Sequence, residues 1–176
     1  MKPLAVVALA LTFTACARFG YTNRVLHRVP SPDARLVAVC QEIPELDGPG
    51  YDIRLEQPDG SLVMHLYRIG DGDPCHEVAW SPDGRLLAVL SGHVARIRFV
   101  DVRKALAERS TADRWFWPQI DLGSEGHHTY GRELRFVTPA DVEVTTCPYD
   151  LRETQRARGR IRCAGTDTRR RVAAPL

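Results

Sequence analysis

The chain has 176 residues, with 24 Lys and Arg against 22 Asp and Glu, so its formal net charge at pH 7 is only +2. Hydrophobic residues make up 44% of the chain and charged residues 26%, close to globular averages, which excludes a wholly disordered protein. This length is enough for one domain of ordinary size with its own core.

Residues 1–15 predict a secretion signal peptide rather than part of that domain. Lys2 supplies a positive start, and Leu4 to Phe13 form an apolar run too short for a stable membrane anchor. The stretch Phe13-Thr14-Ala15-Cys16 resembles the bacterial lipobox, whose cysteine is lipidated and becomes the mature N-terminus. The resemblance implies a lipoprotein, and Ala17 in place of an aspartate implies the periplasmic face of the outer membrane. The alternative is an ordinary cleaved signal that leaves Cys16 free.

The other cysteines agree with export. Four remain after Cys16, an even number that suggests two disulfides in an oxidising compartment: Cys40, Cys75, Cys147 and Cys163. Four cysteines allow three pairings, and the alternative of four free thiols requires that the signal be misread.

Residues 16–24 carry no periodicity and are expected to form a short tether, followed by a β-repeat domain over 25–165. Two copies of one turn sequence lie fifty residues apart, Ser31-Pro32-Asp33-Ala34 and Ser81-Pro82-Asp83-Gly84. Proline presets φ at the second position of a type I turn, aspartate is tolerated at the third, and glycine is accepted at the fourth. Each turn leads into a matching apolar run, which predicts two antiparallel strand pairs built to one pattern.

Alternation and turn residues predict the remaining elements. The first unit has four strands, one before the Ser31 turn and three over 35–43, 51–57 and 61–69. The second has strands over 77–80, 85–91 and 95–102, then a short surface helix at 103–109. A third, weaker copy covers 133–147 around Thr138-Pro139, with 158–164 as its third strand. Residues 166–176 have no pattern and are expected to fray as a disordered basic tail.

The apolar-Trp strand, the Ser81 to Gly84 turn, the following Arg-Leu-Leu-Ala-Val and a strand ending Val100-Asp101-Val102 resemble the repeats of TolB-type and WD-type β-propellers. The resemblance implies four-stranded antiparallel blades, with the turn joining the two innermost strands. The chain offers at most two and a half blades, whereas closed propellers have four to eight. The expected fold is therefore all-β, an incomplete propeller or a sandwich, with one short surface helix.

An incomplete array has three ways to cover its open faces: the sheets fold back on one another, the chain assembles with itself, or it docks on a larger partner. The blade resemblance also implies a cysteine pairing. The end of a second strand and the entry to the next blade lie on the same face, which implies Cys40 with Cys75. Cys147 and Cys163 would then link adjacent strands of the last unit.

Side chains with chemistry are sparse. His127-His128, with His76-Glu77, are the most ligand-like group, but no helical His-x-x-x-His or Glu-x-x-His spacing is present, so no metal or cofactor is expected. Asp71-Gly72-Asp73 is read as a turn, because the further acidic ligands of a calcium loop are absent. No hydrolase elbow, phosphate loop or dinucleotide fingerprint occurs, so an enzyme is not expected.

Two further features concern partners. The triplet Trp115-Phe116-Trp117 is either core or an exposed surface for a partner or glycan. Residues 148–176 carry eight arginines against three acidic residues, a net charge of +5, whereas residues 16–147 carry −4. Export disfavours nucleic acid, so the basic segment is either a solvated tail or faces an anionic envelope surface.

The leading interpretation is a lipid-anchored envelope protein that acts as a non-catalytic, protein-binding or accessory module, with an envelope protein or a second copy as partner. The alternative is an envelope hydrolase or carbohydrate-binding accessory that uses the His127-His128 loop and the Trp115 to Trp117 aromatics.

Overall fold

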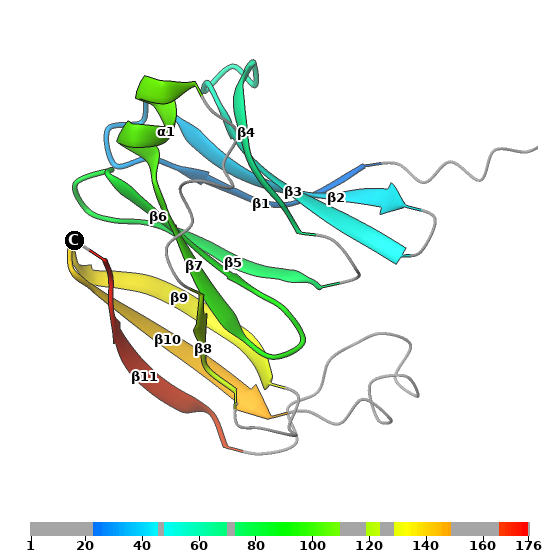
Figure 1. The fold of residues 1–176 in the computed structure, drawn as a ribbon, viewed down its shortest axis with the longest axis vertical. Coiled ribbons are helices and arrows are strands. Elements are labelled where there is room, and N and C mark those ends of the chain that lie inside the picture. The colour runs from blue at the N-terminus through cyan, green and yellow to red at the C-terminus, as the bar shows by residue number, and fades with distance from the viewer. Residues whose placement is uncertain are drawn as a thin grey trace, which may run out of the picture.

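The computed structural model describes residues 23–45, 48–69, 73–109, 119–123, 129–148 and 166–175. Within these residues the chain forms three antiparallel sheets and one short helix (Figure 1). The prediction of an all-β protein with antiparallel, blade-like sheets and a single short helix is confirmed.

Sheet A follows the chain order and contains the first four strands: β1 (Arg24–Pro30), β2 (Val37–Glu45), β3 (Gly48–Glu56) and β4 (Leu62–Ile69). The four strands expected in the first unit are therefore present. Alternation decides their faces: Cys40 of β2 and Ile53 of β3 belong to a core, and their strand neighbours Gln41 and Asp52 lie on the opposite face.

Sheet B repeats this order with β5 (Cys75–Trp80), β6 (Leu86–Ser91), β7 (Arg96–Asp101) and β8 (Ile120–Asp121). Helix α1 (Val102–Glu108) follows β7, close to its predicted place. It begins where the Asp101 carboxylate accepts a hydrogen bond from the Lys104 amide at 3.1 Å, and it ends at Arg109, whose φ is 44°.

Sheet C has the order β11-β10-β9, with β9 (Thr129–Thr138), β10 (Asp141–Pro148) and β11 (Thr168–Ala173). The predicted strand pair around Thr138-Pro139 is confirmed. The expectation that residues 166–176 form a disordered tail is wrong, because β11 pairs with β10 along its length. Val172 and Ala174 pack against the core on this side, and the Ala174 amide donates to the Ala140 carbonyl at 2.7 Å. The strand predicted at 158–164 lies outside the described residues.

The two Ser-Pro-Asp turns have the same hydrogen bonds, which shows that the sequence repeat is a structural one. In the first, the Ser31 hydroxyl donates to Asp33 at 2.7 Å and accepts from the Leu36 amide at 3.0 Å. In the second, the Ser81 hydroxyl makes the equivalent bonds at 2.6 and 2.8 Å. These serine and aspartate side chains therefore serve the turn.

Both turns end on a residue with positive φ, +67° at Gly84 and +57° at Ala34. The first copy thus places an alanine in a conformation that glycine adopts more easily.

Sheet B is the middle layer of the stack, and each of its faces borders a separate core. Leu87 and Val89 of β6 belong to the core shared with sheet A, while Leu86, Ala88 and Leu90 belong to the core shared with sheet C. All six residues of β6 are buried. The Trp80 indole of β5 crosses from sheet B to sheet A and donates to the Val29 carbonyl of β1 at 3.0 Å.

A disulfide between Cys40 of β2 and Cys75 of β5 joins sheets A and B, as the blade resemblance implied. Both cysteines are buried. Cys147 is also disulfide-bonded. Cys163 lies outside the described residues, so its pairing stays a prediction.

Candidate functional site

Several sequence-predicted site residues lie outside the described residues. These are the proposed lipidation site Cys16, the aromatic triplet Trp115, Phe116 and Trp117, and the loop residues His127 and His128. The predictions about them stay predictions.

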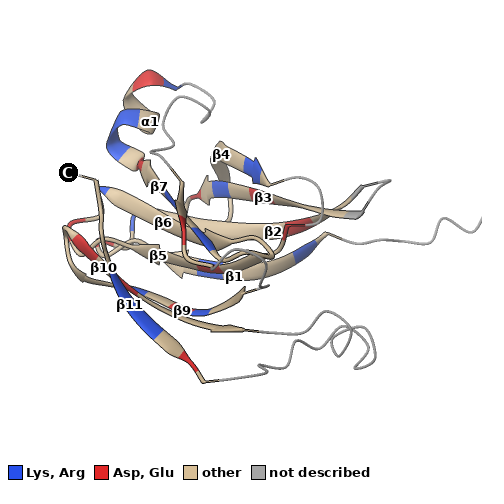
Figure 2. Cartoon of the chain, turned by 60° about the horizontal axis from the view of Figure 1, so that its bottom comes forward, with Lys and Arg blue, Asp and Glu red and all other residues tan. Residues whose placement is uncertain are grey.

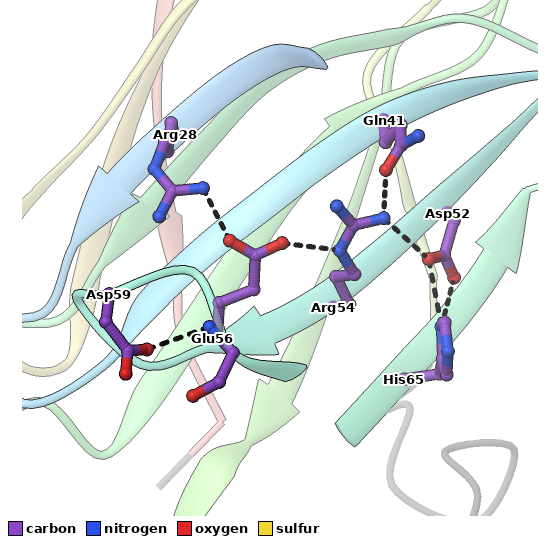
Figure 3. Close-up of polar contacts among 8 residues, drawn as sticks. Arg28, Gln41, Asp52, Arg54, Glu56, Asp59 and His65 are labelled. Carbon is purple, nitrogen blue, oxygen red and sulfur yellow. Dashed lines mark hydrogen bonds and ion pairs between the residues drawn. The ribbon is translucent and has the colours of Figure 1, made fainter. Parts of the chain in front are cut away.

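The most extensive polar arrangement is the outer-face cluster of sheet A (Figure 3). Strand alternation places its members on the face turned away from sheet B, and Arg54 of β3 lies at its centre. The cluster consists of Arg28, Gln41, Asp52, Arg54, Glu56 and His65.

Each acidic group of this cluster has more than one partner. The Glu56 carboxylate accepts from Arg54 Nε at 2.7 Å and from Arg28 Nη1 at 2.5 Å. The Asp52 carboxylate lies 2.9 Å from His65 Nδ1 and 3.6 Å from Arg54 Nη1. Arg54 also donates to the side chain of Gln41. The hydrogen-bonding groups are thus directed at one another.

Glu56 is only 4% exposed. Burial by itself would raise the pKa of Glu56, but the hydrogen bonds from Arg54 and Arg28 outweigh it and hold this pKa below its usual value. A carboxylate kept charged and paired in this way stabilises a surface rather than carrying a proton. The cluster covers the outer face of sheet A with charged and polar groups, and a further sheet packed there would have to bury the exposed side chains of Arg28 and His65.

Sequence reasoning missed this cluster, although β3 contains a signal for it. Asp52, Arg54 and Glu56 alternate with the apolar Ile53 and Leu55, so one face of a single strand carries charges of both signs.

His76 and Glu77, the described members of the proposed ligand group, have other roles. The His76 ring is buried, its Nε2 donates to the Gly92 carbonyl at 2.8 Å, and it packs edge-on against Tyr130. Burial is the main cause that lowers the pKa of His76 to about 4. Glu77 instead faces His27 of β1, 3.6 Å away. Among the residues that the structure describes, no group of three His, Cys, Asp or Glu could hold a metal ion.

Glu77 also borders an open pocket of about 390 Å³ beside β9, with Glu133 and Arg132 on its wall. Burial raises the pKa of Glu77, the charge on His27 opposes this, and Glu133 adds to it. The arginines of this pocket already have carboxylate partners: Arg132 pairs with Asp167 at 2.8 Å, and Arg135 with Glu143 at 2.5 Å. The pocket therefore resembles an ion-paired surface more than an empty ligand site.

The edge strand of sheet C carries part of the basic C-terminal segment. Three consecutive arginines, Arg169, Arg170 and Arg171, lie on β11 and form its long blue segment in Figure 2. Arg170 donates to the Leu122 carbonyl at 3.0 Å, and Arg169 lies 3.7 Å from Glu143. All three are exposed.

The described surface is apolar at the start of β4. Leu62 is 53% exposed and Val63 is 37% exposed; among the described large hydrophobic residues only Val25 of β1 shares this exposure. Next to them a groove of about 420 Å³ separates β4 from α1 and is lined by Val63, Met64, Leu106 and Arg109. We call this surface the β4–α1 groove, and Leu62 precedes Val63 at its entrance along the strand. Sequence reasoning did not find it, because its two walls lie forty residues apart in the chain.

Comparison with known proteins gives a partial likeness to solved structures. No family model and no curated protein matches the chain. Hsv2 of Kluyveromyces lactis is 23% identical over 73% of this chain and 43% of its own, with a TM-score of 0.46. The isopeptidase AtxE2 is 14% identical over 87% of this chain and 30% of its own, with a TM-score of 0.49. The chain thus spans less than half the length of either. Separately, no helix among the described residues is long and apolar enough to cross a bilayer.

Proposed function

We propose that this protein is a lipid-anchored envelope protein that binds another protein through its β-sheet domain and has no catalytic activity. The proposal includes a signal peptide, lipidation at Cys16, attachment at the periplasmic face of the outer membrane, and a TolB-type relationship of the repeats. An envelope protein or a second copy of the chain is the partner.

One observation carries the binding role, namely the exposed apolar side chains of the β4–α1 groove. Contiguous apolar side chains on a protein surface mark interaction sites far more often than single exposed ones do. Leu62 and Val63 are adjacent in the chain, and Val63 continues into the groove with Met64 and Leu106.

The ion-paired outer faces support the same proposal. On sheet A the carboxylates of Asp52 and Glu56 are held by arginines, and on sheet C Glu143 is held by Arg135. A partner that added another blade would have to cover the exposed arginines of these outer faces, Arg28 and Arg135, at a desolvation cost. The β4–α1 groove offers apolar surface without that cost.

The test uses the full chain purified from membranes after cross-linking, with mass spectrometry of the attached proteins. Leu62→Glu is expected to remove at least one cross-linked protein that the wild type retains. Val25→Glu is the matched control, because Val25 is 47% exposed on β1 and away from the groove. Equal cross-linking by the wild type and both variants would contradict a binding role for the groove.

The anchor is tested separately by Cys16→Ala. This variant is expected to lose incorporation of labelled palmitate and to leave the membrane fraction. If the wild type carries no lipid label and the variant stays in the membrane fraction to the same extent, the lipoprotein part of the proposal is contradicted.

A further inference from the structure

The free strand edges of this protein differ in their chemistry. Edge strands expose unpaired backbone N–H and C=O groups, and soluble proteins usually shorten such strands or place charges on them. In sheet B the outermost described strand, β8, has two residues, and in sheet C the outermost described strand, β11, carries three arginines. Both edges are protected against pairing with another chain.

The outer edge of β4 has neither kind of protection. It is the last strand of sheet A, and no described strand pairs with that edge. It runs for eight residues with the sequence LVMHLYRI, in which Arg68 is the only arginine, lysine or acidic residue, and no proline or glycine interrupts it. Its pairing with β3 shifts register at Ile53/Arg54 and at Leu55/Glu56, but its length and low charge still suit it to pair with another extended segment.

The surroundings of this edge favour a negatively charged segment. Residues 57–69 form the turn before β4 and the strand itself, and residues 102–109 form α1 and its C-terminal cap. They hold four basic residues against Asp59 and Glu108, a net charge of +2. Arg109 lies on the wall of the groove, and no described carboxylate pairs with it.

We propose that the outer edge of β4 binds an extended, acidic segment of a partner protein by strand addition. The backbone of the segment would continue the ladder of sheet A, an apolar side chain would enter the groove over Val63 and Leu106, and an acidic side chain on the same face would approach Arg109. Side chains two residues apart in a strand share a face, so the expected pattern is apolar-x-acidic. This inference rests on the proposed function and names the chemistry of the partner at that surface.

The first test measures binding of a fluorescein-labelled peptide, Val-Thr-Glu-Thr-Val-Thr-Glu, to the full chain by fluorescence anisotropy. Saturable binding is expected. The same peptide with lysine in place of glutamate should bind about two- to fivefold more weakly, the range for a single exposed ion pair. Arg109→Glu should reverse this preference, Leu62→Glu should weaken binding of both peptides, and Val25→Glu should leave both unchanged.

The second test separates strand addition from simple occupation of the groove. A peptide that is N-methylated at every second residue has the same side chains but loses the N–H groups of one edge. With several backbone hydrogen bonds removed, it should bind roughly tenfold or more weakly in one of the two methylation registers. Hydrogen exchange of residues 62–69 should slow when the unmodified peptide binds.

Three results would overturn the inference. One is the absence of saturable binding, and another is equal binding of the glutamate and lysine peptides. The third is full protection of residues 62–69 from hydrogen exchange in the free protein, which would mean that the edge is already covered. Sedimentation would then tell whether a second copy covers it, in a dimer, or a segment of the same chain, in a monomer. If membrane cross-linking still depends on Leu62 in these cases, the proposed function survives and only the strand-addition mode fails.

Discussion

Replacing His76 by glutamine is expected to remove a large part of the acid sensitivity of this fold. His76 is 8% exposed, and its ring centroid lies 4.4 Å from that of Tyr130. Burial lowers the pKa of His76 from 6.5 to about 4, and the charges on His93 and His27 act in the same direction. The hydrogen bond to Gly92 and the carboxylate of Asp73 oppose this shift without cancelling it.

The sign and size of the effect follow from these two pKa values. In the unfolded chain the histidine takes up a proton near pH 6.5, whereas in the folded protein it does so only near pH 4. Between these values the unfolded state binds more protons, so the free energy of unfolding falls as the pH is lowered from 6.5 to 4 and levels off below 4. The difference in pKa corresponds to about 3 kcal/mol.

The assay is urea unfolding of the wild type and His76→Gln, followed by tryptophan fluorescence at several pH values between 7.5 and 4. Glutamine keeps an N–H donor for the Gly92 carbonyl but does not titrate. The variant will be less stable at pH 7.5, since it loses ring packing, but the gap should narrow by about 3 kcal/mol toward pH 4. Titrating groups that do not interact with His76 are common to both proteins and cancel in the difference. A gap that stays constant over this range would refute the reasoning.

Three further predictions concern stability. Ala34→Gly should raise the free energy of unfolding by about 0.5–1 kcal/mol, because glycine adopts the positive φ of this position more easily. Gly84→Ala should lower it by about 1 kcal/mol for the same reason. Urea unfolding that showed both changes to be destabilising would be inconsistent with the turn geometry. Glu56→Gln should cost about 1–3 kcal/mol at pH 7, since Arg28 and Arg54 lose their carboxylate partner. Because the pKa of Glu56 is lowered in the folded state, its stabilising effect exists above the ordinary carboxylate range and disappears in acid. The free energies of unfolding of wild type and variant should therefore converge in acid, and a constant difference would argue against ion pairing. Replacing Cys40 and Cys75 together by serine should cost roughly 3–4 kcal/mol for a loop of 35 residues, measured by thermal unfolding, and an unchanged melting temperature would mean that the bond adds nothing.

Sequence reasoning succeeded where structure is decided locally. The turn at Ser81 to Gly84 is fixed by its own side chains, and the apolar runs on either side can only be strands. The first copy was found by likeness even though Ala34 stands where the second copy has Gly84. Helix α1 was predicted from residues with high helix propensity, and the Asp101 cap places its first turn.

The errors and omissions have a different physical cause, since they depend on which segments meet in space. β11 contains three consecutive arginines and shows no alternation, so nothing local marks it as a strand. It forms a strand because its backbone pairs with the edge of β10 and because Val172 packs against the core. The outer-face cluster likewise needs Arg28 from β1 and Glu56 from β3 side by side, a neighbourhood that only the register of β2 creates.

The position of β6 has a consequence for how the protein comes apart. Its residues alternate between the two cores, as do those of β5 and β7 in the same sheet, so neither core can loosen without disturbing the backbone that supports the other. A stack of three sheets joined by short loops would otherwise be free to melt one layer at a time. Because Leu87 and Ala88 are neighbours on one strand but serve opposite sides, the layers are coupled, and the domain should lose its structure in a single cooperative transition.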